Sequence, residues 1–188
     1  MNILLGLAPF IVFFVLMRLV SPLAGLVAAF AVAVLLGVQQ WRRGQQIKVL
    51  EIGTLLLFGA LVLYTLIAAP HWSVATVRLV VDSGLFAIGL ASLLIGIPFT
   101  LQYAREQVPR EYWDSPLFFV TNQRITGAWT AAFAVMAAAD AAAEYVEAIP
   151  VWIDIAVTVA AFVAALWFTR WYSALVRRRA ETAAASSG

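Results

Sequence analysis

Long apolar runs alternate along the chain with short breaks that contain prolines or charges. An α-helix that crosses a bilayer needs about 20 apolar residues, and the backbone in lipid must satisfy its own hydrogen bonds. The breaks at Ser21-Pro22, Pro70 and Pro98 interrupt a helix because proline lacks a backbone N–H. The pattern therefore predicts six membrane spans, over residues 3–20, 23–39, 49–69, 73–97, 125–145 and 151–172.

The composition agrees with a membrane protein. Hydrophobic residues make up 64% of the 188 positions and charged residues only 12%, with a mean hydropathy of +0.94. Soluble domains carry about a quarter charged residues. These values exclude a soluble enzyme, a chain that is disordered as a whole and a nucleic-acid-binding module. We expect an all-α, polytopic transmembrane helical bundle that forms one domain over residues 1–188, with no nucleic-acid partner.

The positions of the basic residues predict an orientation. With six spans, all of the 12 lysines and arginines except Arg18 and Arg78 fall on one side of the membrane. The positive-inside rule then places both termini in the cytoplasm. A topology with five spans is the alternative, but it spoils this separation of charge. The chain becomes apolar directly after Met1-Asn2, without the basic region of a cleaved signal, so residues 3–20 are expected to be a retained span.

Two segments are expected outside the spans. Residues 99–124 mix charges with large aromatic side chains, which is typical of a connector lying in the headgroup region on the cytoplasmic side. A docking surface for a partner is the alternative interpretation of this connector. Residues 180–188 are small and polar, and they are predicted to form a disordered tail.

Small residues recur every four positions on two of the predicted spans. Helices in lipid associate through close packing of such residues. The pattern predicts tight helix–helix faces inside the bundle, and a homodimer seam would use the same pattern. The two sets are Gly25, Ala29, Ala33 and Gly37, and Ala134, Ala138 and Ala142.

Ionisable residues inside the spans are the strongest candidates for a site. Arg78 and Asp82 are four residues apart and share a helix face, and Asp140 and Glu144 do the same on the next span. Asp82 lies about 14 Å along the axis from the start of its span. A lone charge at the bilayer centre costs about 2.5–3.5 kcal/mol. We therefore expect Arg78, Asp82, Asp140 and Glu144 to form an intramembrane polar cluster. Its outer rim would hold Arg18, His71, Glu147 and Asp154.

Two interpretations of this cluster remain open. It can be a structural ion-pair knot that fixes the order and rotation of the helices. It can also line a polar, outward-facing cavity for a solute, a proton or a lipid headgroup, because intramembrane ionisable residues often mark such paths. The chain has no cysteine and one histidine, His71, which is expected to be an interfacial side chain rather than a catalytic base. We expect no catalytic residues, no metal and no cofactor. A lipid-modifying enzyme that uses the same acids is the least favoured alternative.

Several short motifs along the chain resemble one known group, the intracellular septation protein A family of small bacterial inner-membrane proteins. In order, they are Pro9 to Phe14 followed by Arg18, Trp41-Arg42-Arg43 through Lys48-Val49, Phe58-Gly59, Arg78 with Leu85-Phe86, Trp129 with Phe133 and Asp140, and Trp152-x-Asp154. Gly6 stands where the family tends to have Asp, and Asp140 and Asp154 stand where it has Asn.

The resemblance implies a function without catalysis. It implies a multi-pass protein of the bacterial inner (cytoplasmic) membrane that supports cell-envelope maintenance or septation. The partners that it implies are other inner-membrane proteins, in addition to the membrane lipids themselves. A small transporter or channel-like protein built around the polar cluster is the alternative function.

Overall fold

The computed structural model describes residues 3–68, 72–146 and 150–186. All regular structure in these three segments is helical, which confirms the predicted all-α class. The elements are α1 (Ile3–Gly6), α2 (Ala8–Leu19), α3 (Pro22–Arg42), α4 (Val49–Ala68), α5 (Val74–Leu94), α6 (Phe99–Arg105), the 3₁₀ turn η1 (Arg110–Tyr112), α7 (Pro116–Tyr145) and α8 (Val151–Ser186).

Five of the described helices are long and apolar enough to cross a membrane, namely α3, α4, α5, α7 and α8. The first predicted span, at residues 3–20, is divided into α1 and α2 by a break at Leu7. Pro9 explains the break, because a proline is accommodated in the first turn of a helix and not in its interior. Helix α2 has 12 residues and is about 18 Å long, which is shorter than a bilayer core of about 30 Å.

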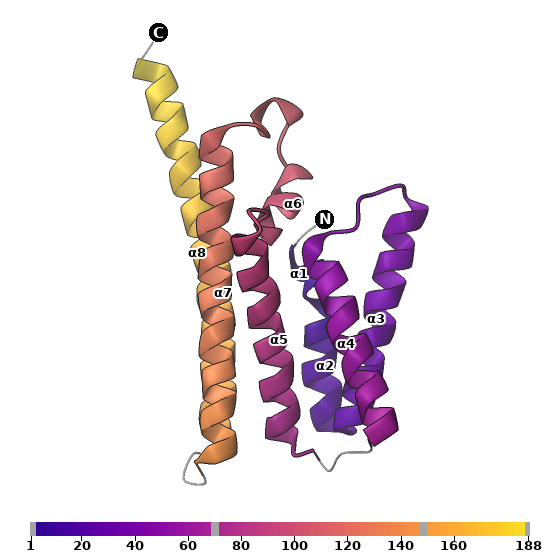
Figure 1. The fold of residues 1–188 in the computed structure, drawn as a ribbon. Coiled ribbons are helices and arrows are strands. Elements are labelled where there is room, and N and C mark those ends of the chain that lie inside the picture. Colours follow the sequence, from indigo (N-terminus) through magenta and orange to yellow (C-terminus); the bar gives the residue numbers. More distant parts are fainter. Residues whose placement is uncertain (1–2, 69–71, 147–149, 187–188) are drawn as a thin grey trace.

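Neighbouring helices run up and down and pack in sequence order (Figure 1). Helix α2 packs mainly on α3, α3 on α4, α4 on α5, α5 on α7, and α7 on α8. Helix α5 lies between the group α2–α4 and the pair α7–α8, and α2 and α8 are drawn behind α4 and α7 (Figure 1). This central position lets side chains of α5 meet residues from both halves of the bundle.

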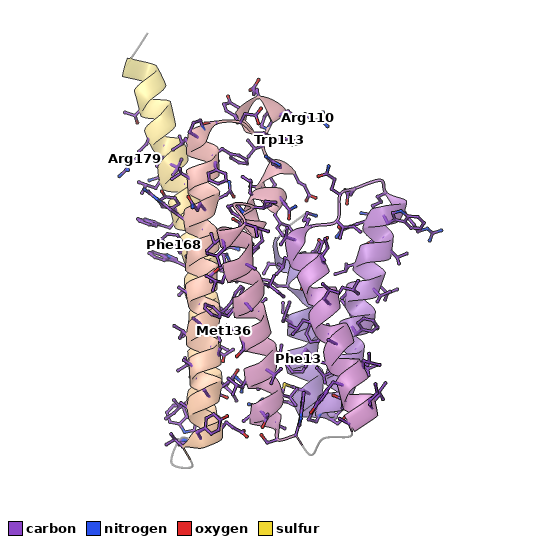
Figure 2. The ribbon with its side chains drawn as sticks, in the orientation of Figure 1. Phe13, Arg110, Trp113, Met136, Phe168 and Arg179 are labelled. Atoms are coloured by element: carbon purple, nitrogen blue, oxygen red, sulfur yellow. The ribbon has the colours of Figure 1, made fainter. Side chains whose placement is uncertain are left out.

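One end of the bundle collects most of the charged connections. We name it the basic end, and it holds residues 43–48, residues 95–115 and the C-terminal part of α8 (Figure 1). Arg110, Trp113 and Arg179 lie there (Figure 2). The opposite end holds the turn between α2 and α3 and the start of α8.

Aromatic side chains form much of the core. The ring centroid of Phe58 lies 5.1 Å from that of Phe10, which joins α4 to α2. Trp129 contacts Phe162 edge-on at 5.4 Å, which joins α7 to α8. The buried indole N–H of Trp129 also donates to Thr169 Oγ1 at 3.0 Å, so its polar end is satisfied within the bundle.

The small residues of α3 pack inside the chain for most of their length. A Cβ atom at Gly25 would lie 3.0 Å from Met17 Cβ and 3.0 Å from the Phe13 carbonyl oxygen, so glycine allows α2 to approach α3 closely. Ala29 and Ala33 are buried as well, whereas a Cβ at Gly37 would meet nothing within 4 Å. The face on α3 therefore serves the contact with α2, and a second copy is not needed to cover it.

Two helices extend beyond the boundaries expected for them. Helix α7 begins at Pro116 rather than at Ile125, so the connector is shorter than residues 99–124. A proline at the first helical position is pre-organised for the helix, which explains the earlier start. Helix α8 continues to Ser186 through residues where a disordered tail was expected. Those residues are rich in alanine, the strongest helix former.

Candidate functional site

The buried guanidinium of Arg78 is the centre of the polar cluster. Arg78 lies on α5, one turn after its start, and is only 2% exposed. Its Nη2 atom lies 2.7 Å from Asp140 Oδ1 on α7. Its Cζ atom lies 5.3 Å from the ring centroid of Phe14 on α2, within the range of a cation–π contact. One side chain therefore touches two other helices.

Asp154 completes the coordination of Arg78 from α8. The carboxylate forms a two-point pair with the guanidinium, in which Nη1 donates to Oδ2 and Nη2 donates to Oδ1 at 3.2 Å. Thr158, one turn later on α8, accepts a further hydrogen bond from Arg78 Nη2 at 3.1 Å. The planar fork of an arginine matches a carboxylate in this way. Asp154 was expected at the outer rim, but the structure buries it in the cluster.

Asp82 and Asp140 face each other beside this ion pair. Asp140 is fully buried and Asp82 is 9% exposed. The two carboxyl groups are close enough for the charge of each to affect the other.

The cluster holds more carboxyl groups than cations. Three aspartates, Asp82, Asp140 and Asp154, surround the single guanidinium of Arg78. An unpaired carboxylate removed from water is costly, and such a group takes up a proton instead. Since Asp154 already neutralises Arg78, a proton shared between Asp82 and Asp140 is the arrangement that burial favours.

A cavity of about 180 Å³ adjoins the cluster. Asp82 and Arg78 form part of its wall, and the rest is almost entirely apolar. The wall is built by residues from α2, α5, α7 and α8, including Phe10, Phe14, Val81, Phe133, Val159 and Phe162. The arrangement places a carboxyl group at the surface of an otherwise hydrocarbon-like space.

The other predicted site residues lie elsewhere. Glu144 is separate from the Arg78 cluster, because its carboxylate accepts hydrogen bonds from Ser73 Oγ at 2.7 Å and from Thr76 Oγ1 at 2.6 Å. It thereby ties the end of α7 to the start of α5. Arg18 is exposed, with its guanidinium 5.9 Å from the Phe14 ring centroid. His71 and Glu147 fall outside the described residues.

A second polar cluster, at the basic end, was not predicted. Lys48 is buried, and its Nζ lies 2.9 Å from Glu106 Oε1 and 3.6 Å from Glu51 Oε1. Gln40 donates to Glu51 Oε1 at 2.7 Å. Burial, reinforced by the nearby Glu51 carboxylate, raises the pKa of Tyr103, whose ring lies 4.8 Å from Lys48 Nζ. This cluster fastens α3, α4 and α6 together.

The sequence signal for this second cluster was weak. Lys48 follows the pattern of a loop charge that sets orientation, and its partner Glu106 lies far along the chain. A hint was available in Glu51, which follows Lys48 by three residues and accepts from the Lys48 backbone N–H at 3.0 Å. This is the reciprocal half of a capping box at the start of α4.

The chemistry available to these clusters is proton binding and ion pairing. Within the described parts of the chain, no group of side chains has the arrangement of a metal site. No protein-family model, curated protein or solved structure matches the chain. The interpretation of the site therefore depends on its own geometry.

Proposed function

We propose that this chain is a non-enzymatic, multi-pass protein of the bacterial inner membrane that supports envelope maintenance or septation through contacts with other membrane proteins. The observation that carries the proposal is the pairing of Arg78 with both Asp140 and Asp154. This pairing joins α5, α7 and α8 by side chains that have no need of a substrate. It supports a scaffold whose helices are held in one fixed order.

The topology that we propose has six passes and both termini in the cytoplasm. Helices α1 and α2 together make up the first pass, with α2 running antiparallel to α3 (Figure 1). The basic end carries the connector and the C-terminal part of α8, and its arginines favour the cytoplasmic side. The short first pass is accommodated by local thinning of the bilayer.

The surface that we propose for partners is the outer face of α8. Trp167 and Trp171 stack at 5.7 Å between ring centroids and are 63% and 46% exposed. The basic run Arg177 to Arg179 follows them toward the cytoplasm. Exposed aromatic residues mark interfaces with lipid headgroups and with other proteins. A second copy of the chain is the alternative occupant of this face.

The test is cross-linking in a bacterium that encodes the chain. A photoreactive residue replacing Trp167 should capture inner-membrane proteins of the division or envelope machinery, and depletion of the chain should disturb septation. The matched control replaces Leu56, which is 67% exposed on α4. Capture of lipid alone at Trp167, together with normal septation after depletion, would reject the proposal.

A second candidate function is favoured by a separate observation. Asp82 lines the cavity between α2 and α8, and Arg78, the basic residue beside it, is already paired with Asp140 and Asp154. A small transporter or channel-like protein would use such a group to bind a solute or a proton. An Asp82→Asn variant that folds normally but loses uptake of a solute would support this function. Unchanged uptake in that variant would reject it.

A further inference from the structure

The wall of the cavity beside Asp82 combines one acid with several aromatic rings. Asp82 is 9% exposed. Rings from three helices line the same space, namely Phe10, Phe13, Phe14, Phe133 and Phe162. A carboxylate and the faces of aromatic rings are the two protein groups that attract organic cations. Both occur here around a single cavity.

The nearby arginine does not offset this preference. Arg78 Nη1 donates to Asp154, and Nη2 contacts Asp154, Asp140 and Thr158. Its strongest donors are thus already engaged, so an anion entering the cavity would have to compete with two carboxylates. Asp82 is the charged group of the wall that can still accept hydrogen bonds or pair with an opposite charge. The site therefore favours a cation.

The volume of the cavity and the direction in which it opens further restrict which ligands can bind. An apolar cavity of about 150 Å³ is enough to hold benzene, and this cavity has about 180 Å³. Its wall includes Ile11, Val159 and Val163, which are 45%, 51% and 55% exposed. These residues lie on α2 and α8, which pack mainly on α3 and α7, so the cavity opens sideways toward lipid. A ligand that arrives this way must itself be lipophilic.

We propose that this cavity binds a lipophilic organic monocation, of the size of a quaternary ammonium carrying one aromatic ring, in exchange for a proton. The inference rests on the second candidate function and names its ligand class. The cation takes a place against Asp82 and the phenylalanine rings. The proton shared by Asp82 and Asp140 leaves to solvent, so one positive charge enters as one departs and the charge of the site is unchanged.

The test is isothermal titration calorimetry on the full chain in an uncharged maltoside detergent. The probe is benzyltrimethylammonium, and the control ligand is neopentylbenzene, which has the same shape without the charge. We expect the cation to bind at least about tenfold more tightly than the neutral compound. Titrations in two buffers that differ in ionisation enthalpy should show about one proton released for each cation bound.

Variants separate a specific site from adsorption to the detergent. Asp82→Asn should weaken cation binding at least about tenfold and abolish proton release, whereas Asp114→Asn, at an exposed acid in the connector, should change neither. Val159→Trp places a bulky ring at the mouth of the cavity and should also weaken binding. Val135→Trp is the matched control, since Val135 is 49% exposed on α7 and does not line the cavity.

Three results would overturn the inference. They are no binding of the cation to the wild-type chain, equal affinity for the neutral compound, and undiminished binding by Val159→Trp. Val159→Trp keeps Arg78 and the three aspartates of the cluster, so it tests the inference even if Asp82→Asn fails to fold. None of these results bears on the scaffold function, which is tested by cross-linking at Trp167.

Discussion

Arg78 and Asp154 are separated by 76 positions in the sequence and form a two-point ion pair in the interior of the bundle. Helices α5 and α8 both pack on α7, and this pair links them to each other directly. The contact therefore closes a ring of three helices around buried charge. Removing this ion pair should weaken the packing of all three helices.

The first prediction concerns the strength of this pair. Removing one partner of a buried ion pair leaves an uncompensated charge, and the usual loss is about 3–5 kcal/mol. We expect Asp154→Asn to lower the free energy of unfolding by an amount in this range, measured by denaturant titration in detergent. Asp140→Asn should cost less, because Asp140 makes a single contact with Arg78 whereas Asp154 makes two. Equal losses for the two variants would contradict this assignment.

The second prediction tests the shape of the arginine. Lysine keeps the charge of Arg78 but cannot form a two-point pair with a carboxylate. We expect Arg78→Lys to lie between the wild type and Asp154→Asn in stability. An Arg78→Lys variant as stable as the wild type would show that charge alone holds the three helices together.

The third prediction concerns the contact of α1 with α6. A Cβ atom at Gly6 would clash with the hydroxyl oxygen of Tyr103, which is itself buried. Gly6→Ala should therefore displace Tyr103 from Glu51 and cost about 1–3 kcal/mol, as overpacking does. Gly37→Ala is the matched control, because a Cβ there meets nothing within 4 Å. That substitution should be neutral or stabilising, since alanine is the better helix former.

The fourth prediction concerns topology. The chain contains no cysteine, so single cysteines report position without a background. Gln45→Cys and Asp114→Cys, both at the basic end, should react with a membrane-impermeant maleimide only from the cytoplasm. Val146→Cys, at the opposite end and 46% exposed, should react only from outside. Reaction of Gln45→Cys and Asp114→Cys from different sides would reject the six-pass topology.

The hydrophobic pattern predicted most of the helices, because a chain in lipid has few other ways to satisfy its backbone. It did not predict the break at Leu7, where the local effect of Pro9 outweighs a continuous apolar run. It also did not predict the full length of α8, since a polar, alanine-rich segment can be helical or unfolded depending on what precedes it. Length and hydropathy alone do not decide such cases.

The site was predicted less completely than the fold. The helical spacing of Arg78 and Asp82 places them on one face, but the rotation of each helix toward its neighbours depends on tertiary packing. Asp154 was therefore assigned to the interface from its place near the start of a span, although α8 turns it inward to Arg78. Glu144 was assigned to the cluster for the opposite reason, since a shared face with Asp140 does not ensure a shared partner.

Helix α8 has 36 residues, which makes it about 54 Å long. A bilayer core of about 30 Å would leave the C-terminal part of this helix outside the lipid at the basic end. Asp154 lies near the opposite end of the same helix, which packs mainly on α7. A partner bound to the projecting C-terminal part would therefore hold the same helix whose other end carries the buried ion pair with Arg78.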